Sequence, residues 1–255
     1  METITSRTNP LITHIRKLAN DRKYRRESGQ LLCEGPKMLE EALKWGACLQ
    51  VLVCARGYVP PASLPENVRL VEVPPELLKA IAPTETPQKL LFLCAAPSLA
   101  LPDTLSGHRY LVLDGLQDPG NVGTLWRTAD AFGAHGLFLL PGCADPFSPK
   151  TLRATMGACF RLPVWQGELG PLKTLLRQAG LPLYATALRA DTADLRDTDL
   201  TRSAVVIGSE GRGVCPQVLE ESDLTIQIPM TARCESLNAA AAGSVILWHM
   251  CQASL

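Results

Sequence analysis

The sequence predicts an α/β protein with a parallel sheet in its carboxyl-terminal part and a smaller α/β unit before it. Short apolar runs alternate with helical patterns from residue 110 onwards, which is typical of a parallel sheet covered by helices on both faces. A similar alternation occupies residues 1–97, while residues 98–108 are rich in Pro, Ser and Gly, as linkers are. We therefore expect one domain over residues 1–97 and another over residues 109–255.

The amino-terminal unit is expected to begin with a helix. Between residues 9 and 24, apolar side chains recur at three- and four-residue spacing, which predicts an amphipathic helix. Glu34-Gly35-Pro36 is expected to open a second helix that stops at Gly46, and the pattern near Glu76 predicts a small third one. Short apolar runs predict strands at residues 30–33, 49–53, 68–73 and 90–94.

The carboxyl-terminal part is expected to hold its ligand at one edge of the sheet. Ligands of open parallel sheets gather at the carboxyl ends of the strands. The loops after Leu113, Thr186, Ile207 and Ile228 should therefore form the site. The predicted strands cover residues 110–113, 137–140, 183–186, 204–207 and 224–228.

Composition places the chain among ordinary globular proteins, because 46% of its 255 residues are hydrophobic and 20% are charged. No apolar run approaches the roughly 20 residues that span a bilayer, and the amino terminus lacks the apolar core of a signal peptide. We expect a cytoplasmic protein without a membrane segment. The nine cysteines are odd in number and scattered, and the four histidines lie far apart. This favours buried thiols over disulfides, and no metal site is expected.

The formal net charge is zero, but the charges are unevenly distributed. Residues 7–26 carry seven Lys or Arg against the single Asp21, which makes this stretch a candidate contact for a polyanion. The alternative is a solvated helix face. The candidate contacts in this stretch are Arg16, Lys17, Arg22, Lys23, Arg25 and Arg26.

The first polar loop runs from Asp114 to Arg127. A Gly/Pro turn follows the strand, and Asn121 is expected to cap the next helix, with Arg127 one and a half turns later. An Asn cap with a nearby Arg is often only structural. Arg127 nevertheless offers a permanently charged planar fork that suits phosphate.

The second loop, Gly208 to Gly213, is a glycine-rich turn directly after a buried strand. Glycines let a ligand approach the backbone closely. The loop is neither a G-x-G-x-x-G fingerprint nor a P-loop, since no G-K-[ST] follows. Glu210 would repel a phosphate but suits a cationic or hydroxyl-bearing ligand.

The third segment, Ile228-Pro229-Met230, ends a strand and is followed by Ser236-Leu237-Asn238 and a small, apolar helix over residues 239–248. Ser236 or Asn238 could simply cap that helix. The run of alanines indicates that the helix packs very closely against a backbone or a partner subunit.

In this order, the three segments resemble the motifs of the SpoU/TrmH family of ribose 2′-O-methyltransferases, within the SPOUT class. Asn9-Pro10 and Glu34-Gly35-Pro36-Lys37 also resemble the substrate-binding domain of this family, so the resemblance covers nearly the whole chain. The departures are the Ala239–Ala242 run and the polar spacer Arg233-Cys234-Glu235, which leave every motif residue in place. The motif residues are Asn121, Gly123, Arg127, Gly208, Glu210, Gly211, Gly213, Ile228, Pro229, Met230, Ser236, Leu237 and Asn238.

The resemblance implies a SPOUT domain with a deep trefoil knot, S-adenosylmethionine as cofactor, and a homodimer. It implies that residues 1–97 bind RNA, with Lys37 added to the basic residues named above. The catalytic positions that it implies are Arg127, Asn121, Glu210, Ser236 and Asn238. The cofactor-binding positions are Thr186, Ala187, Leu188, Gly208, Glu210, Gly211, Ile228, Met230, Leu237 and Asn238.

Three alternatives stay open at this point. Large-subunit rRNA is the favoured substrate by analogy, with tRNA as its rival. A Rossmann-type oxidoreductase would need a G-x-G-x-x-G turn and an acidic residue about 20 positions later, which the sequence lacks. A non-catalytic RNA-binding protein on the same fold is disfavoured because Arg127, Glu210 and Asn238 are intact.

Overall fold

The computed structural model describes residues 1–189, 191–231, 233 and 235–252. Contacts divide the chain into two compact units, each described by itself below. Unit 1 comprises residues 1–97 and 145–160, and unit 2 comprises residues 98–144 and 161–255. The boundary at residue 97 lies where the Pro/Ser/Gly stretch begins. Residues 145–160, from the carboxyl-terminal half, nevertheless belong to unit 1. The sequence predicts two continuous domains, so this placement differs from the prediction.

Unit 1 is built on a five-stranded mixed sheet of order β1-β4-β3-β5-β2. β3 pairs in parallel with β4 and antiparallel with β5, and β2 pairs antiparallel with β5. Apolar residues of α1 and α4 pack on one face with Val53, Val71 and Leu91. The strands are β1 Glu2–Thr3, β2 Gln30–Glu34, β3 Leu49–Ala55, β4 Arg69–Val73 and β5 Leu90–Ala95; the helices are α1 Pro10–Asn20, α2 Arg22–Ser28, α3 Pro36–Lys44 and α4 Pro75–Ile81.

The first predicted helix is two helices. Asp21 ends α1 in an extended conformation, and its side chain accepts a hydrogen bond from the Tyr24 amide at the start of α2. An Asp in this position is a strong helix N-cap, so the chain turns within the periodic pattern. α1 keeps the expected amphipathic face, with Ile12, Ile15 and Leu18 fully buried.

The added segment of unit 1 contains α6, Pro149–Thr155, and the short 3-10 helix Ala158–Phe160. It is held by a buried ion pair, in which Arg25 Nε and Nη2 donate to Asp145 Oδ2 at 2.9 and 2.7 Å. Arg25 Nη1 also donates to the Leu18 carbonyl at 2.7 Å. The structure therefore corrects the expectation for Arg25: it is 6% exposed and fully engaged, so it cannot contact RNA.

Unit 2 is a seven-stranded parallel sheet of order β10-β12-β9-β11-β6-β7-β8. This confirms the predicted α/β class and the strands predicted after residue 109. β8 and β10 were missed because each is only two or three residues long. The strands are β6 Arg109–Asp114, β7 Gly136–Leu139, β8 Val164–Gln166, β9 Leu183–Thr186, β10 Ala193–Asp194, β11 Ser203–Gly208 and β12 Leu224–Gln227.

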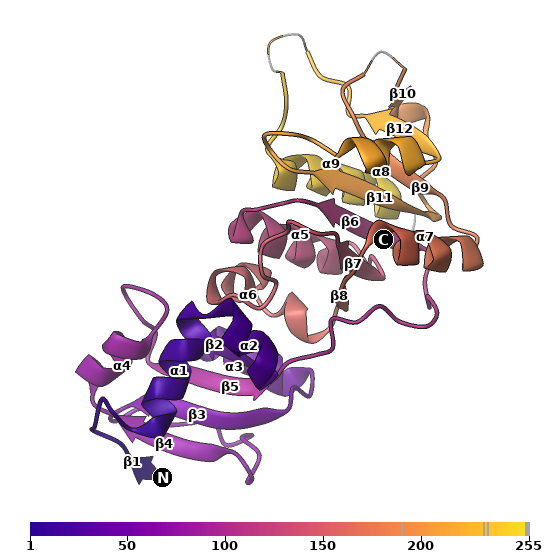
Figure 1. The fold of residues 1–255 in the computed structure, drawn as a ribbon. Coiled ribbons are helices and arrows are strands. Elements are labelled where there is room, and N and C mark those ends of the chain that lie inside the picture. Colours follow the sequence, from indigo (N-terminus) through magenta and orange to yellow (C-terminus); the bar gives the residue numbers. More distant parts are fainter. Residues whose placement is uncertain (190, 232, 234, 253–255) are drawn as a thin grey trace. The chain divides into compact units, whose positions relative to one another are not determined.

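Helices cover both faces of this sheet, as Figure 1 shows. α7 and α8 pack on the face that carries Tyr110, Val112 and Val206, and α5 and α9 pack together on the other face. A Cβ at Gly243 of α9 would lie 2.4 Å from the Leu125 side chain of α5. The small residues of α9 thus serve a close helix contact within the chain. The helices are α5 Pro119–Ala131, α7 Leu169–Gln178, α8 Pro216–Glu221, α9 Ala239–Cys251 and the 3-10 helix Leu195–Asp197.

Two further expectations concern membrane-spanning segments and the state of the cysteines. Within the part of the chain that the structure describes, no helix has the length and apolarity needed to cross a bilayer. The eight described cysteines are free thiols, and six of them are buried. Burial raises the pKa of the Cys54 thiol to about 11. Cys234 lies outside the described residues.

Candidate active site

A pocket of about 390 Å³ lies at the carboxyl ends of β9, β11 and β12, at the edge of the sheet where the sequence placed the site. Its walls come from the loops after these three strands and from the start of α9. Eight of the ten predicted cofactor positions line it, together with the predicted catalytic Ser236. These eight are Thr186, Ala187, Leu188, Gly208, Glu210, Ile228, Met230 and Leu237.

The glycine-rich loop owes its shape to two of its glycines. Ser209 and Gly213 exchange backbone hydrogen bonds of 3.1 and 2.9 Å, which close the loop into a tight ring. A Cβ at Gly208 would lie 2.0 Å from the Gly213 carbonyl carbon, and Gly213 has a φ of +67°. Gly211 has open space around its Cα. The ring needs glycine at positions 208 and 213, and position 211 tolerates a methyl group.

Asn121 joins α5 to this loop, but it does not cap the helix. Asp118 is the N-cap, and its carboxylate accepts from the Gly120 and Asn121 amides. The expectation of an Asn121 cap is therefore wrong, since Pro119 at the first helical position sets the start one turn earlier. The Asn121 side-chain amide instead donates to the Glu210 carboxylate. This bond fixes the glycine-rich loop against the first motif.

Asn238 caps α9, as its sequence position suggested. Its Oδ1 accepts from the amides of Ala240 and Ala241 at 2.9 and 3.3 Å. Asn238 and Gly211 are absent from the lining of the pocket, whereas Ser236 and Leu237 belong to it. Asn238 therefore positions the third motif by ending the loop and starting the helix.

Arg127 is exposed on α5 and does not line the pocket. Among the described residues, its guanidinium makes no hydrogen bond or ion pair. A cation that is exposed and unpaired can bind a phosphate or ribose from solution without breaking a protein contact. The structure brings Asn121 and Glu210 together. Arg127 stays on the exposed side of α5, without a partner among the described residues.

The pocket fits an adenosine-type ligand in size and lining. Its volume falls within the range of small-molecule sites, and such sites combine apolar walls with a few polar groups. Leu188, Met230 and Leu237 supply apolar wall, and Leu188 and Leu237 are 62% and 38% exposed. A ligand would cover this apolar surface. Glu210 supplies a negative charge that suits a cationic sulfonium.

Sequence reasoning missed several residues at the same edge. Arg189, Ser209, Arg212 and Val214 also line the pocket. A second hollow of about 460 Å³ adjoins it through Ser209 and Arg212 and is lined by the buried Asp114. Each of these residues neighbours a predicted position, so a scan of whole loops would have found them.

Comparison with known proteins decides the family. The SpoU rRNA Methylase family matches residues 108–248, and an MRM3-like substrate binding domain matches residues 9–91. The chain belongs to the SpoU rRNA methylase family. This membership confirms the resemblance drawn from the three motifs and gives unit 2 the SPOUT fold.

Relatives align over nearly their whole length. The 23S rRNA (guanosine(2553)-2′-O)-methyltransferase RlmP of Bacillus subtilis is 34% identical over 98% of this chain and 99% of that protein. The 23S rRNA (uridine(2479)-2′-O)-methyltransferase of Streptomyces viridochromogenes is 30% identical over 96% of this chain and 90% of that protein. The AdoMet-bound rRNA methyltransferase from Sinorhizobium meliloti superposes with a TM-score of 0.89 at 31% identity, covering 100% of this chain and 98% of that one.

Proposed function

We propose that the protein transfers a methyl group from S-adenosylmethionine to a ribose 2′-hydroxyl of large-subunit rRNA. The observation that supports this proposal is the pocket at the ends of β9, β11 and β12, which is lined by eight of the ten positions predicted from the sequence to bind the cofactor. Two relatives that align along nearly the whole chain are named as 23S rRNA 2′-O-methyltransferases. They act on a guanosine and a uridine, so the base is not part of the proposal.

In this reaction the ribose oxygen attacks the methyl carbon, the C–O bond forms and the C–S bond breaks. S-adenosylmethionine supplies the activated methyl group, and its sulfonium leaves as a neutral thioether. The contribution of the protein is to align the reactants and to ease loss of the hydroxyl proton. Glu210, held by the Asn121 amide, would keep the glycine-rich loop in register, and Ser236 would contact the ligand from the third motif.

Arg127 would orient the acceptor by contact with its ribose or phosphate. Its guanidinium stays protonated above pH 12, so an electrostatic role fits it better than proton abstraction. Asn238 would act by fixing the loop that carries Ser236 and Leu237, because its own side chain is occupied by the helix amides.

A homodimer is part of the proposal. α9 leaves Trp248 and Val245 half exposed, at 50% and 40%, and Phe132 lies against Trp248 with ring centroids 5.6 Å apart. Exposed apolar side chains that cluster in this way favour contact with a second copy. Trp248→Glu should shift the sedimentation of the protein towards a monomer. A monomeric wild type would refute the dimer.

A cytoplasmic location is also part of the proposal, because bacteria make ribosomal RNA in the cytoplasm.

The reaction is tested by incubating the purified protein with methyl-labelled S-adenosylmethionine and separate pools of unmodified large-subunit rRNA and tRNA. Label in the rRNA alone supports the proposal. Label in tRNA alone would replace the substrate, and no label in either pool, despite cofactor binding, would favour the non-catalytic alternative.

A further inference from the structure

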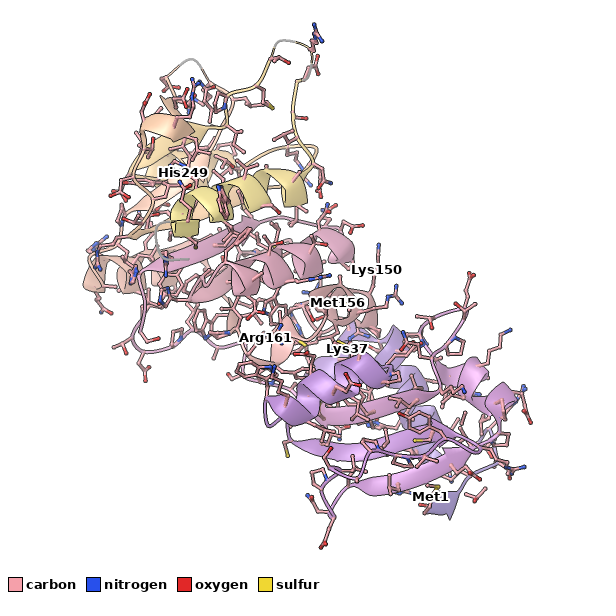
Figure 2. The ribbon with its side chains drawn as sticks, turned by 180° about the vertical axis from the view of Figure 1, so that it is seen from behind. Met1, Lys37, Lys150, Met156, Arg161 and His249 are labelled. Atoms are coloured by element: carbon pink, nitrogen blue, oxygen red, sulfur yellow. The ribbon has the colours of Figure 1, made fainter. Side chains whose placement is uncertain are left out.

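Unit 1 contains a groove of about 560 Å³ that no motif of the methyltransferase explains. It is formed by three segments that are distant in sequence: the start of α3, the loop over residues 83–88, and the end of α6. We call it the unit 1 groove. Lys37 and Met156, labelled in Figure 2, come from two of these segments and line it together.

Two walls of the unit 1 groove are clamped to each other. The Glu34 carboxylate accepts hydrogen bonds from the Thr84 hydroxyl at 2.7 Å and from the Gln88 amide at 2.8 Å. Gly35 has a φ of +98°, and a Cβ there would lie 2.2 Å from the Gln88 side chain. The loop is therefore pressed against the start of α3, and the groove is preformed.

The third wall ends in a strained residue. Among the described residues, Met156 is the one non-glycine residue with a positive φ, at +50°. Its side chain is 40% exposed. The next position, 157, requires glycine, because a Cβ there would lie 2.6 Å from the Glu41 side chain. Strain of this kind persists where the structure around it imposes it, and it often marks a binding site.

The unit 1 groove is lined by two cations, Lys37 and Arg153, and by two carboxylates, Glu34 and the exposed Glu85. Lys37 is 3.5 Å from both Glu40 and Glu41, so its charge is balanced. The exposed Arg153 lines the groove and forms no ion pair within the described part of the chain. The carboxylate of Glu34 is occupied by its hydrogen bonds. Unit 1 as a whole carries 15 Lys and Arg against 11 Asp and Glu.

We propose that the unit 1 groove takes an unpaired nucleotide of the RNA substrate, with Arg153 on its phosphate and Met156 against its base. Proteins that recognise RNA in single-stranded loops splay bases out and stack them on aromatic side chains or on Arg guanidinium planes. The thioether of a Met also makes favourable contacts with aromatic rings. Thr86 offers a hydroxyl to the same nucleotide. This inference rests on the proposed function, because it names where that RNA binds. The inference also gives a role to α6, because Arg153 and Met156 come from the end of this helix.

The first test measures the affinity of the full-length protein for a single-stranded RNA dodecamer and for a duplex of equal length. Arg153→Gln should weaken binding to the single strand about five- to tenfold and lower the slope of log K against log salt by roughly 0.7, as expected for one lost phosphate contact. Lys79→Gln is the matched control, because it removes an exposed charge of the same unit outside the groove. Equal losses in the two variants would overturn the inference.

The second test uses Met156→Gly, which removes the side chain and relieves the positive φ. Glycine adopts this conformation without strain, so the thermal stability should stay the same or rise. Affinity for the single strand should fall roughly two- to tenfold, with an unchanged salt slope. Unchanged affinity in this stable variant would contradict the role of Met156.

These outcomes separate the inference from the proposed function. If wild type transfers methyl groups to rRNA while Arg153→Gln and Met156→Gly bind and methylate it normally, the groove assignment fails and the function stands. If no RNA is methylated but both variants lose single-strand affinity, the groove assignment stands and the function fails.

Discussion

The buried ion pair between Arg25 and Asp145 gives the sharpest test of how unit 1 is built. Both side chains are 7% exposed, and the guanidinium also donates to the Leu18 and Ala19 carbonyls. Arg25→Ala would leave a buried carboxylate without its partner and two carbonyls without a donor. Removing one partner of a buried pair costs about 3 to 5 kcal/mol. We expect this loss in the free energy of unfolding.

The double variant Arg25→Met with Asp145→Asn separates the cost of an unpaired buried charge from the cost of lost packing. The amide oxygen of Asn can still accept from the Phe147 amide, which Asp145 Oδ1 does at 3.0 Å. No charge is then buried, so the double variant should lose only roughly 1 to 2 kcal/mol. It should therefore be more stable than Arg25→Ala alone.

Urea unfolding followed by circular dichroism measures both variants. If Arg25 were an RNA contact on a solvated helix, Arg25→Ala would change stability by less than about 0.5 kcal/mol and would weaken RNA binding instead. That pattern, or a double variant less stable than Arg25→Ala, would refute the account of the pair.

Three further predictions concern unit 2. Gly208→Ala should weaken S-adenosylmethionine binding at least about tenfold, because its methyl group meets the Gly213 backbone at 2.0 Å, whereas Gly211→Ala should bind normally; equal calorimetric affinities would contradict this. Arg127→Ala should lower the transfer rate at least roughly a hundredfold with cofactor affinity unchanged, and a parallel loss of both would remove its assigned role. Burial lowers the pKa of His135, with His108 and Arg109 adding to the effect, so the unfolded state binds the proton more readily. The free energy of unfolding should then fall as pH drops below the ordinary histidine pKa of about 6.5, and His135→Phe should flatten that slope in urea titrations; an equally steep slope in the variant would count against it.

Much of unit 2 could be predicted because its signals are local. Continuous apolar runs mark its longer strands, and the rule for parallel sheets places the ligand at their carboxyl ends. Thr186, Gly208 and Ile228 therefore meet at one pocket. The glycines of the second motif could not be ranked from sequence, because only the closed ring distinguishes Gly208 from Gly211.

The errors arose where contacts are distant in sequence. Arg25 looks like one more cation of a basic helix, and its partner Asp145 lies 120 residues away. The segment over residues 145–160 has no strong periodicity, so neither α6 nor its place in unit 1 was expected. The Asn121 error was avoidable, since Asp118-Pro119 is the stronger signal for a helix start. The trefoil knot stays a prediction from the family resemblance.

The most direct test of the central claim is the chemical identity of the methylated nucleoside. Large-subunit rRNA incubated with the protein and S-adenosylmethionine is digested to nucleosides and analysed by mass spectrometry, with Arg127→Ala in parallel. The account predicts one 2′-O-methylated nucleoside that is absent from the Arg127→Ala digest. A base-methylated nucleoside, or the same product from both proteins, would contradict it.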